Sequence, residues 1–232
     1  MIRWLRPGDP FPPLTQALAE PNGLLAAGGE LSAARLIEAY RNGIFPWFNH
    51  GQPILWWSPD PRMVLIPREL KVARSLGKIL RNRDYEVRAD TDFRQVISAC
   101  AAPRATQDGT WISAEMIAAY GALHERGIAH SIETWIDGEL AGGLYGVAIG
   151  RMFYGESMFA RVPDASKIAL VHLVRELQRR DFGMVDCQMH TRHLASFGAR
   201  EIPRADFMRK LQELVNCPHV PGRWTIDRDL VE

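Results

Sequence analysis

Residues 130–160 read HSIETWIDGELAGGLYGVAIGRMFYGESMFA, and this stretch decides the class of fold. It alternates in the manner of half-buried β-strands. The dipeptide Asp137-Gly138 is a strong signal for a two-residue hairpin turn, and Gly150-Arg151 suggests a second turn. The stretch therefore predicts an antiparallel meander of strands.

Helical and strand patterns surround this meander in a definite order. Before it we expect a strand at residues 63–66, a helix at 69–83 with Val72 on its inward face, a strand at 85–89, and helices at about 92–101 and 113–127. Thr91 and Ser113 are the candidate N-caps of the last two helices. After the meander we expect a long amphipathic helix, a buried strand and a last helix, at residues 164–180, 183–189 and about 206–215.

The order of meander, helix, strand and helix indicates an α+β fold. It is also the order of the N-acetyltransferase-like (GNAT-type) fold, in which helices flank a mixed sheet. We therefore expect that fold for a C-terminal domain, residues 62–232.

The first 61 residues have a different composition, because they are rich in Pro, Gly and Trp. They contain one good helix, SAARLIEAYRNG at residues 32–43, which Ser32 can cap and Gly43 can end. Residues 43–62, GIFPWFNHGQPILWWSPDPR, hold three tryptophans among four prolines, and so many prolines argue against a regular element. We therefore expect a small, irregular N-terminal domain at residues 1–61, with Trp56 and Trp57 packing its junction to the second domain.

Composition excludes several classes of protein. The 28 basic and 27 acidic residues leave a net charge of +1, so any nucleic-acid or membrane site must be a local patch. No run is long and apolar enough to span a bilayer, and the N-terminus lacks the apolar core of a signal peptide. Three scattered cysteines form no disulfide framework. These features predict a cytoplasmic protein without a membrane partner.

The stretch MVDCQMHTRH, residues 184–193, carries polar side chains at the end of a core strand. Asp186 and Gln188 should share one face, since they are two residues apart. They are either a structural hydrogen-bonded pair or a pair facing a cleft, where Asp186 holds the Gln188 amide so that its carbonyl accepts a nitrogen-borne proton. We interpret Cys187 as a small buried hydrophobe, and His190 and His193 as surface or capping residues rather than a metal site.

Glu156 lies beside Gly155 on an otherwise apolar strand, with Phe153 and Met158 on either side. A lone carboxylate in such a place is costly unless it binds something positive. It is either a salt-bridged core residue or one wall of an apolar pocket that receives an amine.

A run of basic residues, Lys71, Arg74, Lys78 and Arg81, recurs at helical spacing. Such stripes are usually solvated faces. This stripe, however, follows the tryptophan segment, and aromatics beside a basic surface suit a single-stranded nucleic-acid end. Trp111 is a further indole in a loop. The junction ESMFARVPDASKIAL, residues 156–170, lacks the glycine-rich loop with which N-acetyltransferases hold coenzyme A, so we expect a different acyl donor.

These motifs occur together in one known protein family. The chain closely resembles the bacterial leucyl/phenylalanyl-tRNA–protein transferases from residue 20 to residue 207. The matching blocks are long and specific: PNGLLAAGG, GIFPWF, PILWWSPDPR, GTWIS, HSIETW, GESMF and DCQ. Two departures are Thr191, where the family commonly has Asn, and Phe197, where it commonly has Leu.

The resemblance implies an enzyme without metal or cofactor that moves Leu, Phe or Met from aminoacyl-tRNA to the α-amino group of proteins beginning with Arg or Lys, marking them for degradation. It implies Asp186 and Gln188 as the catalytic pair, with Glu156 beside them. We expect the protein to be a monomer. The basic stripe would follow the tRNA acceptor stem. Trp47 and Trp111 would stack on the terminal adenosine. The other substrate-binding residues would be Leu144, Phe153, Gly155, Met158, Leu170, Leu173 and Leu177.

Two other classes stay open from the residues alone. One is a coenzyme A-dependent N-acyltransferase, against which the missing pyrophosphate loop argues. The other is a non-catalytic RNA-binding module, which would have no use for Glu156, Asp186 and Gln188.

Overall fold

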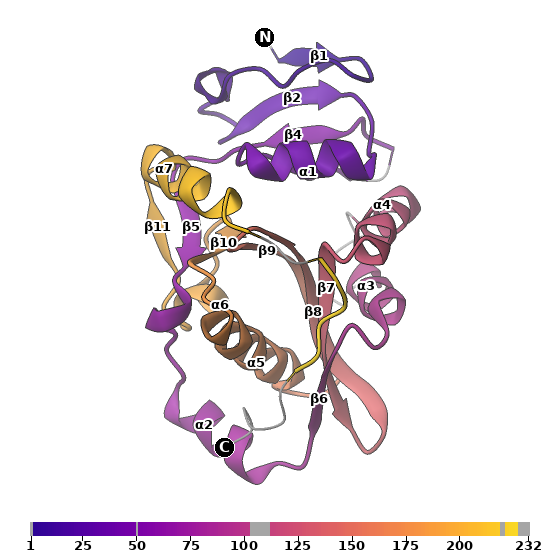
Figure 1. Cartoon of the computed structure of the whole chain (residues 1–232), viewed down its shortest axis with the longest axis vertical. Coiled ribbons are helices and arrows are strands. Elements are labelled where there is room, and N and C mark those ends of the chain that lie inside the picture. Colours follow the sequence, from indigo (N-terminus) through magenta and orange to yellow (C-terminus); the bar gives the residue numbers. More distant parts are fainter. Residues whose placement is uncertain (1, 50, 103–111, 219–220, 227–232) are drawn as a thin grey trace.

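The computed structural model describes residues 2–49, 51–102, 112–218 and 221–226. In this part of the chain, helices pack around two β-sheets (Figure 1). The larger sheet has seven strands in the described residues, and their spatial order is β11 (Arg200–Ile202), β5 (Arg62–Leu65), β10 (Met184–Gln188), β9 (Met152–Ala160), β8 (Glu139–Ile149), β7 (Ala129–Ile136) and β6 (Glu86–Ala89).

The predicted meander is confirmed as β7, β8 and β9, which pair antiparallel in sequence order. Asp137 and Gly138 form the first turn with φ of 52° and 78°, the left-handed backbone that a tight hairpin needs. Gly150, with φ of 60°, opens the second turn. Strand β10 then pairs parallel to β9 and antiparallel to β5, which makes the sheet mixed rather than purely antiparallel.

Helices cover both faces of this sheet. Helix α5 (Ala165–Arg179) lies in the hollow of the curved sheet, while α3 (Phe93–Ala101) and α4 (Ala114–Glu125) lie outside it (Figure 1). Each face therefore has its own apolar core cluster. Helices α6 (Arg192–Ala195) and α7 (Arg204–Val215) lie near β5 and β11. Helix α2 (Arg74–Asn82) follows a 3₁₀ turn, η2 (Pro67–Glu69), and lies below α5 in the view of Figure 1.

The N-terminal part contains a sheet that was not expected. Its described strands, in the order β1 (Arg3–Leu5), β2 (Leu24–Gly28), β4 (Leu55–Trp57) and β3 (Phe45–Pro46), pack beside α1 (Ala33–Arg41). A 3₁₀ turn, η1 (Leu14–Gln16), lies between β1 and β2 in the chain. The prediction of an irregular domain is therefore wrong. Pro46 is tolerated because β3 is an edge strand, and the central strand β4 contains no proline.

Trp56 and Trp57 are core residues, as expected, but they lie within the smaller sheet on β4. Trp56 is fully buried and its Nε1 donates to the Gly28 carbonyl at 2.9 Å. Trp57 Nε1 donates to the carbonyl of Trp47 at 2.6 Å. We propose that the boundary between the two domains, 1–61 and 62–232, lies just after β4, where the chain passes from one sheet to the other.

Two local predictions need correction. Helix α2 begins only at Arg74, so Val72 precedes it and is exposed instead of facing inward. Asp92, not Thr91, caps α3, because the Asp92 side chain accepts the Gln95 backbone N–H. The Ser32 and Ser113 caps are confirmed.

Candidate active site

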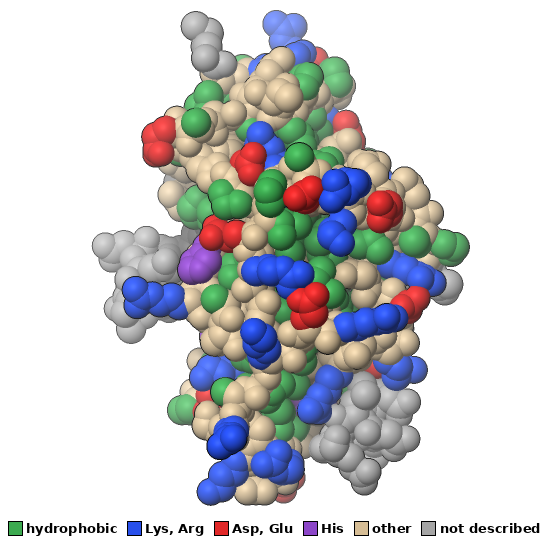
Figure 2. Space-filling model, turned by 90° about the vertical axis from the view of Figure 1, so that its left-hand side faces the viewer, with side chains coloured by type: hydrophobic (Ala, Val, Ile, Leu, Met, Phe, Trp, Pro, Cys, Tyr) green, Lys and Arg blue, Asp and Glu red, His purple; other side chains and the backbone are tan. Residues whose placement is uncertain are grey.

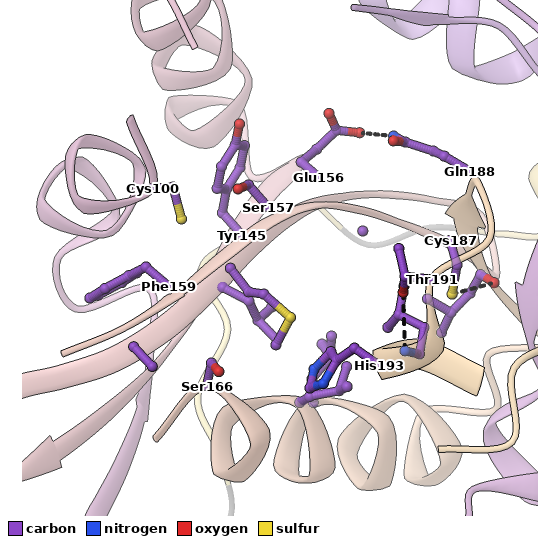
Figure 3. Close-up of a pocket in the computed structure, with 18 of the residues that line it drawn as sticks. Cys100, Tyr145, Glu156, Ser157, Phe159, Ser166, Cys187, Gln188, Thr191 and His193 are labelled. Atoms are coloured by element: carbon purple, nitrogen blue, oxygen red, sulfur yellow. Dashed lines mark hydrogen bonds between the residues drawn. The ribbon is translucent and has the colours of Figure 1, made fainter. Parts of the chain in front are cut away.

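A cavity of about 1010 Å³ opens where β9 and β10 part (Figure 3). The two strands pair only over Met152 to Tyr154 of β9, after which β9 runs on to Ala160 without β10 beside it. The space so created is bounded by β8, β9, the end of β10, helix α5 and the residues that follow β10.

Many of the predicted site residues meet in this cavity. Its lining includes Trp47, Leu144, Phe153, Gly155, Glu156, Met158, Leu170, Leu173 and Gln188. Asp186 and Leu177 are buried outside the lining. Trp111 lies outside the described residues.

Leu177 lies one helical turn beyond Leu173 on α5, where it packs in the core under the sheet. The cavity ends before that turn. Its apolar wall is completed by residues that periodicity alone did not single out, among them Leu65, Val185 and Leu194.

A β-bulge sets the direction of Glu156. In the pairing of β8 with β9, Tyr145 is opposite Ser157 and Gly146 is opposite Gly155, so Glu156 is the extra residue on β9. The bulge turns its carboxylate toward α1 and α4, where two tyrosines receive it.

Glu156 is held by three donors from three separate elements. Tyr40 Oη of α1 donates to Oε1 at 2.8 Å, and Tyr120 Oη of α4 donates to Oε2 at 2.9 Å. Gln188 Nε2, at the end of β10, donates to Oε1 at 3.0 Å (Figure 3). Sequence reasoning missed both tyrosines, because each lies on the apolar stripe of its helix and resembles an ordinary core residue.

Burial raises the pKa of Glu156 to about 7, and the hydrogen bonds from Tyr40 and Tyr120 oppose this rise. Burial also raises the pKa values of both tyrosines well above their usual range, so they stay neutral donors. The two tyrosine hydroxyls lie 2.5 Å apart. When Glu156 is ionised, both hydroxyl protons point to it and none is left between the tyrosines. When Glu156 is protonated, one proton is available for each of the three oxygen pairs: Tyr40–Glu156, Tyr120–Glu156 and Tyr40–Tyr120. This arrangement stabilises the protonated carboxyl group and favours a pKa of Glu156 near neutrality.

Asp186 forms a buried ion pair with Arg62, the first residue of β5. Arg62 Nε donates to Oδ1 at 2.8 Å and Nη2 to Oδ2 at 2.6 Å, with side-chain exposures of 0% and 1%. Arg62 Nη1 also donates to the Gly43 carbonyl at 3.0 Å, and its guanidinium lies 4.8 Å from the Phe45 ring and 4.7 Å from the Phe207 ring. Each nitrogen of the guanidinium therefore has a hydrogen-bond acceptor, and two aromatic rings lie close to it.

Asp186 holds Gln188 through the backbone and not through the side-chain amide. Its Oδ1 accepts the Gln188 backbone N–H at 2.9 Å. A register irregularity between these two residues and a φ of 62° at Gln188 break the strand pattern. The expectation that both side chains share one face is therefore wrong: Asp186 points to Arg62, and Gln188 points to Glu156.

Cys187 borders the cavity, but burial raises the pKa of its thiol far above the usual value, so the thiol stays protonated. His190 is exposed. His193 lines the cavity on α6, where its ring lies 5.3 Å from the Phe197 ring, and burial lowers its pKa. Among the described residues, no three His, Cys, Asp or Glu side chains are grouped as a metal site requires.

Comparison with known proteins now adds to this geometry. A family model described as leucyl/phenylalanyl-tRNA protein transferase matches residues 64–212, and one for the N-terminal domain of the same family matches residues 29–60. The chain belongs to the leucyl/phenylalanyl-tRNA–protein transferase family. The resemblance stated from the motifs is thereby confirmed, and with it the class of enzyme, an aminoacyltransferase.

Relatives with this name match almost end to end. The chain is 66% identical to the leucyl/phenylalanyl-tRNA–protein transferase of Nitrosomonas europaea, over 98% of this chain and 96% of that one. It is 67% identical to that of Thiobacillus denitrificans, over 94% and 95%. Among solved structures, L-PGS from Bacillus licheniformis aligns with 87% of this chain and 65% of its own at 10% identity, with a TM-score of 0.39.

The two departures from the family pattern have a structural account. Thr191 caps α6, because its Oγ1 accepts the Leu194 backbone N–H at 3.1 Å, a role that Asn also performs well. Phe197 is buried beside His193. Both residues therefore lie beside the short helix α6, whose His193 and Leu194 line the cavity.

The basic stripe lies away from the cavity. Lys71 precedes α2, while Arg74, Lys78 and Arg81 lie on it, and all four are exposed. Figure 2 shows basic side chains spread over the lower half of the face that includes this region, with few acidic ones among them. Among the described residues, no helix has the length and apolarity needed to cross a bilayer.

The Arg62–Asp186 pair yields a test by unfolding. Asp186→Asn leaves a buried guanidinium without its carboxylate and should lower the free energy of unfolding by about 3–5 kcal/mol in urea titrations. The double variant Arg62→Met/Asp186→Leu removes both charges and should recover much of this loss, but not transfer activity, because the Gln188 backbone N–H has lost its acceptor. Asp181, an exposed residue that pairs with both Arg68 and Arg151, is the control, and Asp181→Asn should cost about 1 kcal/mol or less. Equal costs for the two single variants would contradict the ion pair's role.

The raised pKa of Glu156 predicts a pH dependence of stability. Because its pKa of about 7 in the folded protein exceeds the ordinary 4.5, the folded state binds a proton that the unfolded chain releases between these values. Wild-type stability should therefore fall as pH rises through this window. Glu156→Gln lacks this titration, so its free energy of unfolding should gain about 2–3 kcal/mol on the wild type between pH 4 and 8. The exposed substitution Glu213→Gln is the control; a parallel pair of curves for Glu156→Gln and wild type would refute the raised pKa.

Proposed function

We propose that this protein moves a leucyl or phenylalanyl group from the 3′ ester of its tRNA to the α-amino group of an acceptor protein, within the cavity between β9 and β10. One observation carries the proposal: an apolar wall and a polar cluster meet in the same cavity. The wall consists of Leu144, Phe153, Met158, Leu170 and Leu173, and the cluster consists of Glu156 and Gln188.

The reaction makes modest chemical demands. The amine nitrogen attacks the ester carbon, a C–N bond forms, the C–O bond to the ribose breaks, and one proton passes from nitrogen to the departing oxygen. The ester is already activated, and an α-amine with an ordinary pKa of about 7.7–8.0 is partly neutral at cytosolic pH. Orientation of the two reactants can therefore supply most of the acceleration.

Gln188 is suited to orient the amine. Its Nε2 is committed to Glu156, which leaves the side-chain carbonyl oxygen as an acceptor. Within the described residues, no donor reaches that oxygen. The carbonyl would accept one amine hydrogen and direct the nitrogen lone pair to the ester carbon. Asp186 acts through the Gln188 backbone and is a positioning residue in this scheme.

Glu156 would supply the charge. Ionised, it attracts the cationic end of the acceptor, and with a pKa of about 7 it can also take up the amine proton and return it to the ribose oxygen. Tyr40 and Tyr120 hold the carboxylate in place through either protonation state.

The finer points of the proposal come from the resemblance to the family. The acceptors would begin with Arg or Lys and be marked for degradation, and Met would serve as a third donor residue. Trp47, a half-buried residue of the cavity lining, would stack on the terminal adenosine, and Lys71, Arg74, Lys78 and Arg81 would follow the acceptor stem. We further propose a cytoplasmic monomer whose larger sheet is of the GNAT type; the parallel β9–β10 pair beside an antiparallel meander supports that fold.

A transfer assay tests the proposal directly. The protein is mixed with Phe-tRNA and a peptide with N-terminal Arg, and mass spectrometry should find the peptide heavier by one Phe residue at its N-terminus. The same peptide with N-terminal Ala should react far less. Absence of transfer from Phe-, Leu- and Met-tRNA alike would refute the proposed function.

Gln188→Ala should lower the transfer rate at least about 100-fold, because it removes the group that orients the amine and its proton. Gln178→Ala, an exposed substitution on α5, is the matched control and should leave the rate unchanged. Urea titrations check that both variants fold. A loss of only a few-fold in a folded Gln188→Ala protein would remove Gln188 from the mechanism.

A further inference from the structure

The C-terminal segment, residues 221–226, forms no helix or strand, yet it is anchored against the larger sheet. In Figure 1 it is the yellow trace that descends from α7 past α5. Its central residue, Trp224, is only 4% exposed. A buried indole in an irregular segment needs an explanation, because such segments usually leave their side chains at the surface.

Contacts from three parts of the chain hold Trp224 in place. Its backbone N–H donates to Asp90 Oδ2 at 2.7 Å, and the same oxygen lies 2.8 Å from His130 Nδ1. The indole stacks on the His130 ring with centroids 4.0 Å apart and planes 14° apart. The Arg180 guanidinium lies 4.7 Å from the indole centroid, and its Nη2 donates to the Thr225 carbonyl at 3.3 Å. The position of Trp224 is therefore strongly determined.

The indole in turn supports a residue of the cavity. Its ring centroid lies 6.0 Å from that of Phe153, which lines the cavity and belongs to the same core cluster. The Phe153 ring crosses Gly146 of β8 so closely that a Cβ there would be 2.5 Å from Phe153 Cζ. Phe153 thus packs against the backbone of β8 and near Trp224, and it also borders the cavity.

We infer that Trp224 is a positioning residue that sets the depth of the aminoacyl side-chain pocket by holding the Phe153 ring in place. The inference rests on the proposed function, because it takes the apolar wall of the cavity as the place where the transferred side chain binds. Leucyl and phenylalanyl groups differ in length, so a small displacement of the Phe153 ring changes which of the two fits better. A residue remote in sequence from the rest of the pocket thereby tunes the choice of donor.

The test is the ratio of kcat/KM for Phe-tRNA to kcat/KM for Leu-tRNA, in which general losses of activity or of folded protein cancel. Trp224→Leu removes the support behind Phe153, so the ring can retreat, and the ratio should shift about three- to tenfold toward Phe. Trp224→Phe keeps a ring that can stack on His130 and should shift the ratio less. Trp4→Leu, at a tryptophan that is 67% exposed, is the control and should leave the ratio unchanged.

Phe153→Leu and the double variant Phe153→Leu/Trp224→Leu complete a double-mutant cycle with Trp224→Leu. If Trp224 acts through Phe153, the second substitution should change the ratio little once Phe153 is gone. An unchanged ratio in folded Trp224→Leu, or equal shifts with and without Phe153, would overturn the inference. If Trp224→Leu does not fold, Trp224→Phe takes its place: a smaller shift in the same direction would support the inference, and an unchanged ratio would overturn it. An unchanged ratio in Phe153→Leu itself would instead count against the proposed placement of the transferred side chain.

Discussion

The buried ion pair between Arg62 and Asp186 is the interaction on which the rest of the structure depends. Two charges with exposures of 0% and 1% are tolerable only when every polar atom is matched. Arg62 meets this demand by reaching the carboxylate with two nitrogens and the Gly43 carbonyl with a third, between the rings of Phe45 and Phe207. One side chain thus joins the end of α1, strand β3, strand β10 and helix α7.

The polar cluster of the cavity follows from that junction. Tyr40 belongs to α1 of the smaller, N-terminal unit, whereas Tyr120, Glu156 and Gln188 belong to α4, β9 and β10 of the larger one. The carboxylate is fully bonded only when both units are docked. Arg62 contacts Gly43 and Phe45 of the smaller unit, and its partner Asp186 also accepts the Gln188 backbone N–H. The ion pair therefore links the two parts of the chain from which Tyr40 and Gln188 reach Glu156.

Features set by local chemistry could be predicted from the sequence, whereas those set by tertiary contacts could not. The turn at Asp137-Gly138 and the caps Ser32 and Ser113 depend on neighbouring residues, and they were predicted correctly. Strand β4 was missed because its pairing comes from β2 and β3, which no local pattern in a proline-rich segment reveals. The same limit explains Tyr40, which lies 116 residues from its partner Glu156 in the chain and looks apolar in its helix.

The bulge at Glu156 explains how one strand serves two chemically different sides of a cavity. In a regular strand, Tyr154, Glu156 and Met158 would all point to one face. Tyr154 does pack in the core cluster that contains Tyr40 and Tyr120, but Met158 packs against the other, with Leu144, Phe153 and Leu170. The extra residue reverses the alternation at that point. The carboxylate therefore faces hydroxyl donors, while the side chain two positions later joins the apolar wall. A single inserted residue thus turns the carboxylate away from the apolar wall, although both border the same cavity.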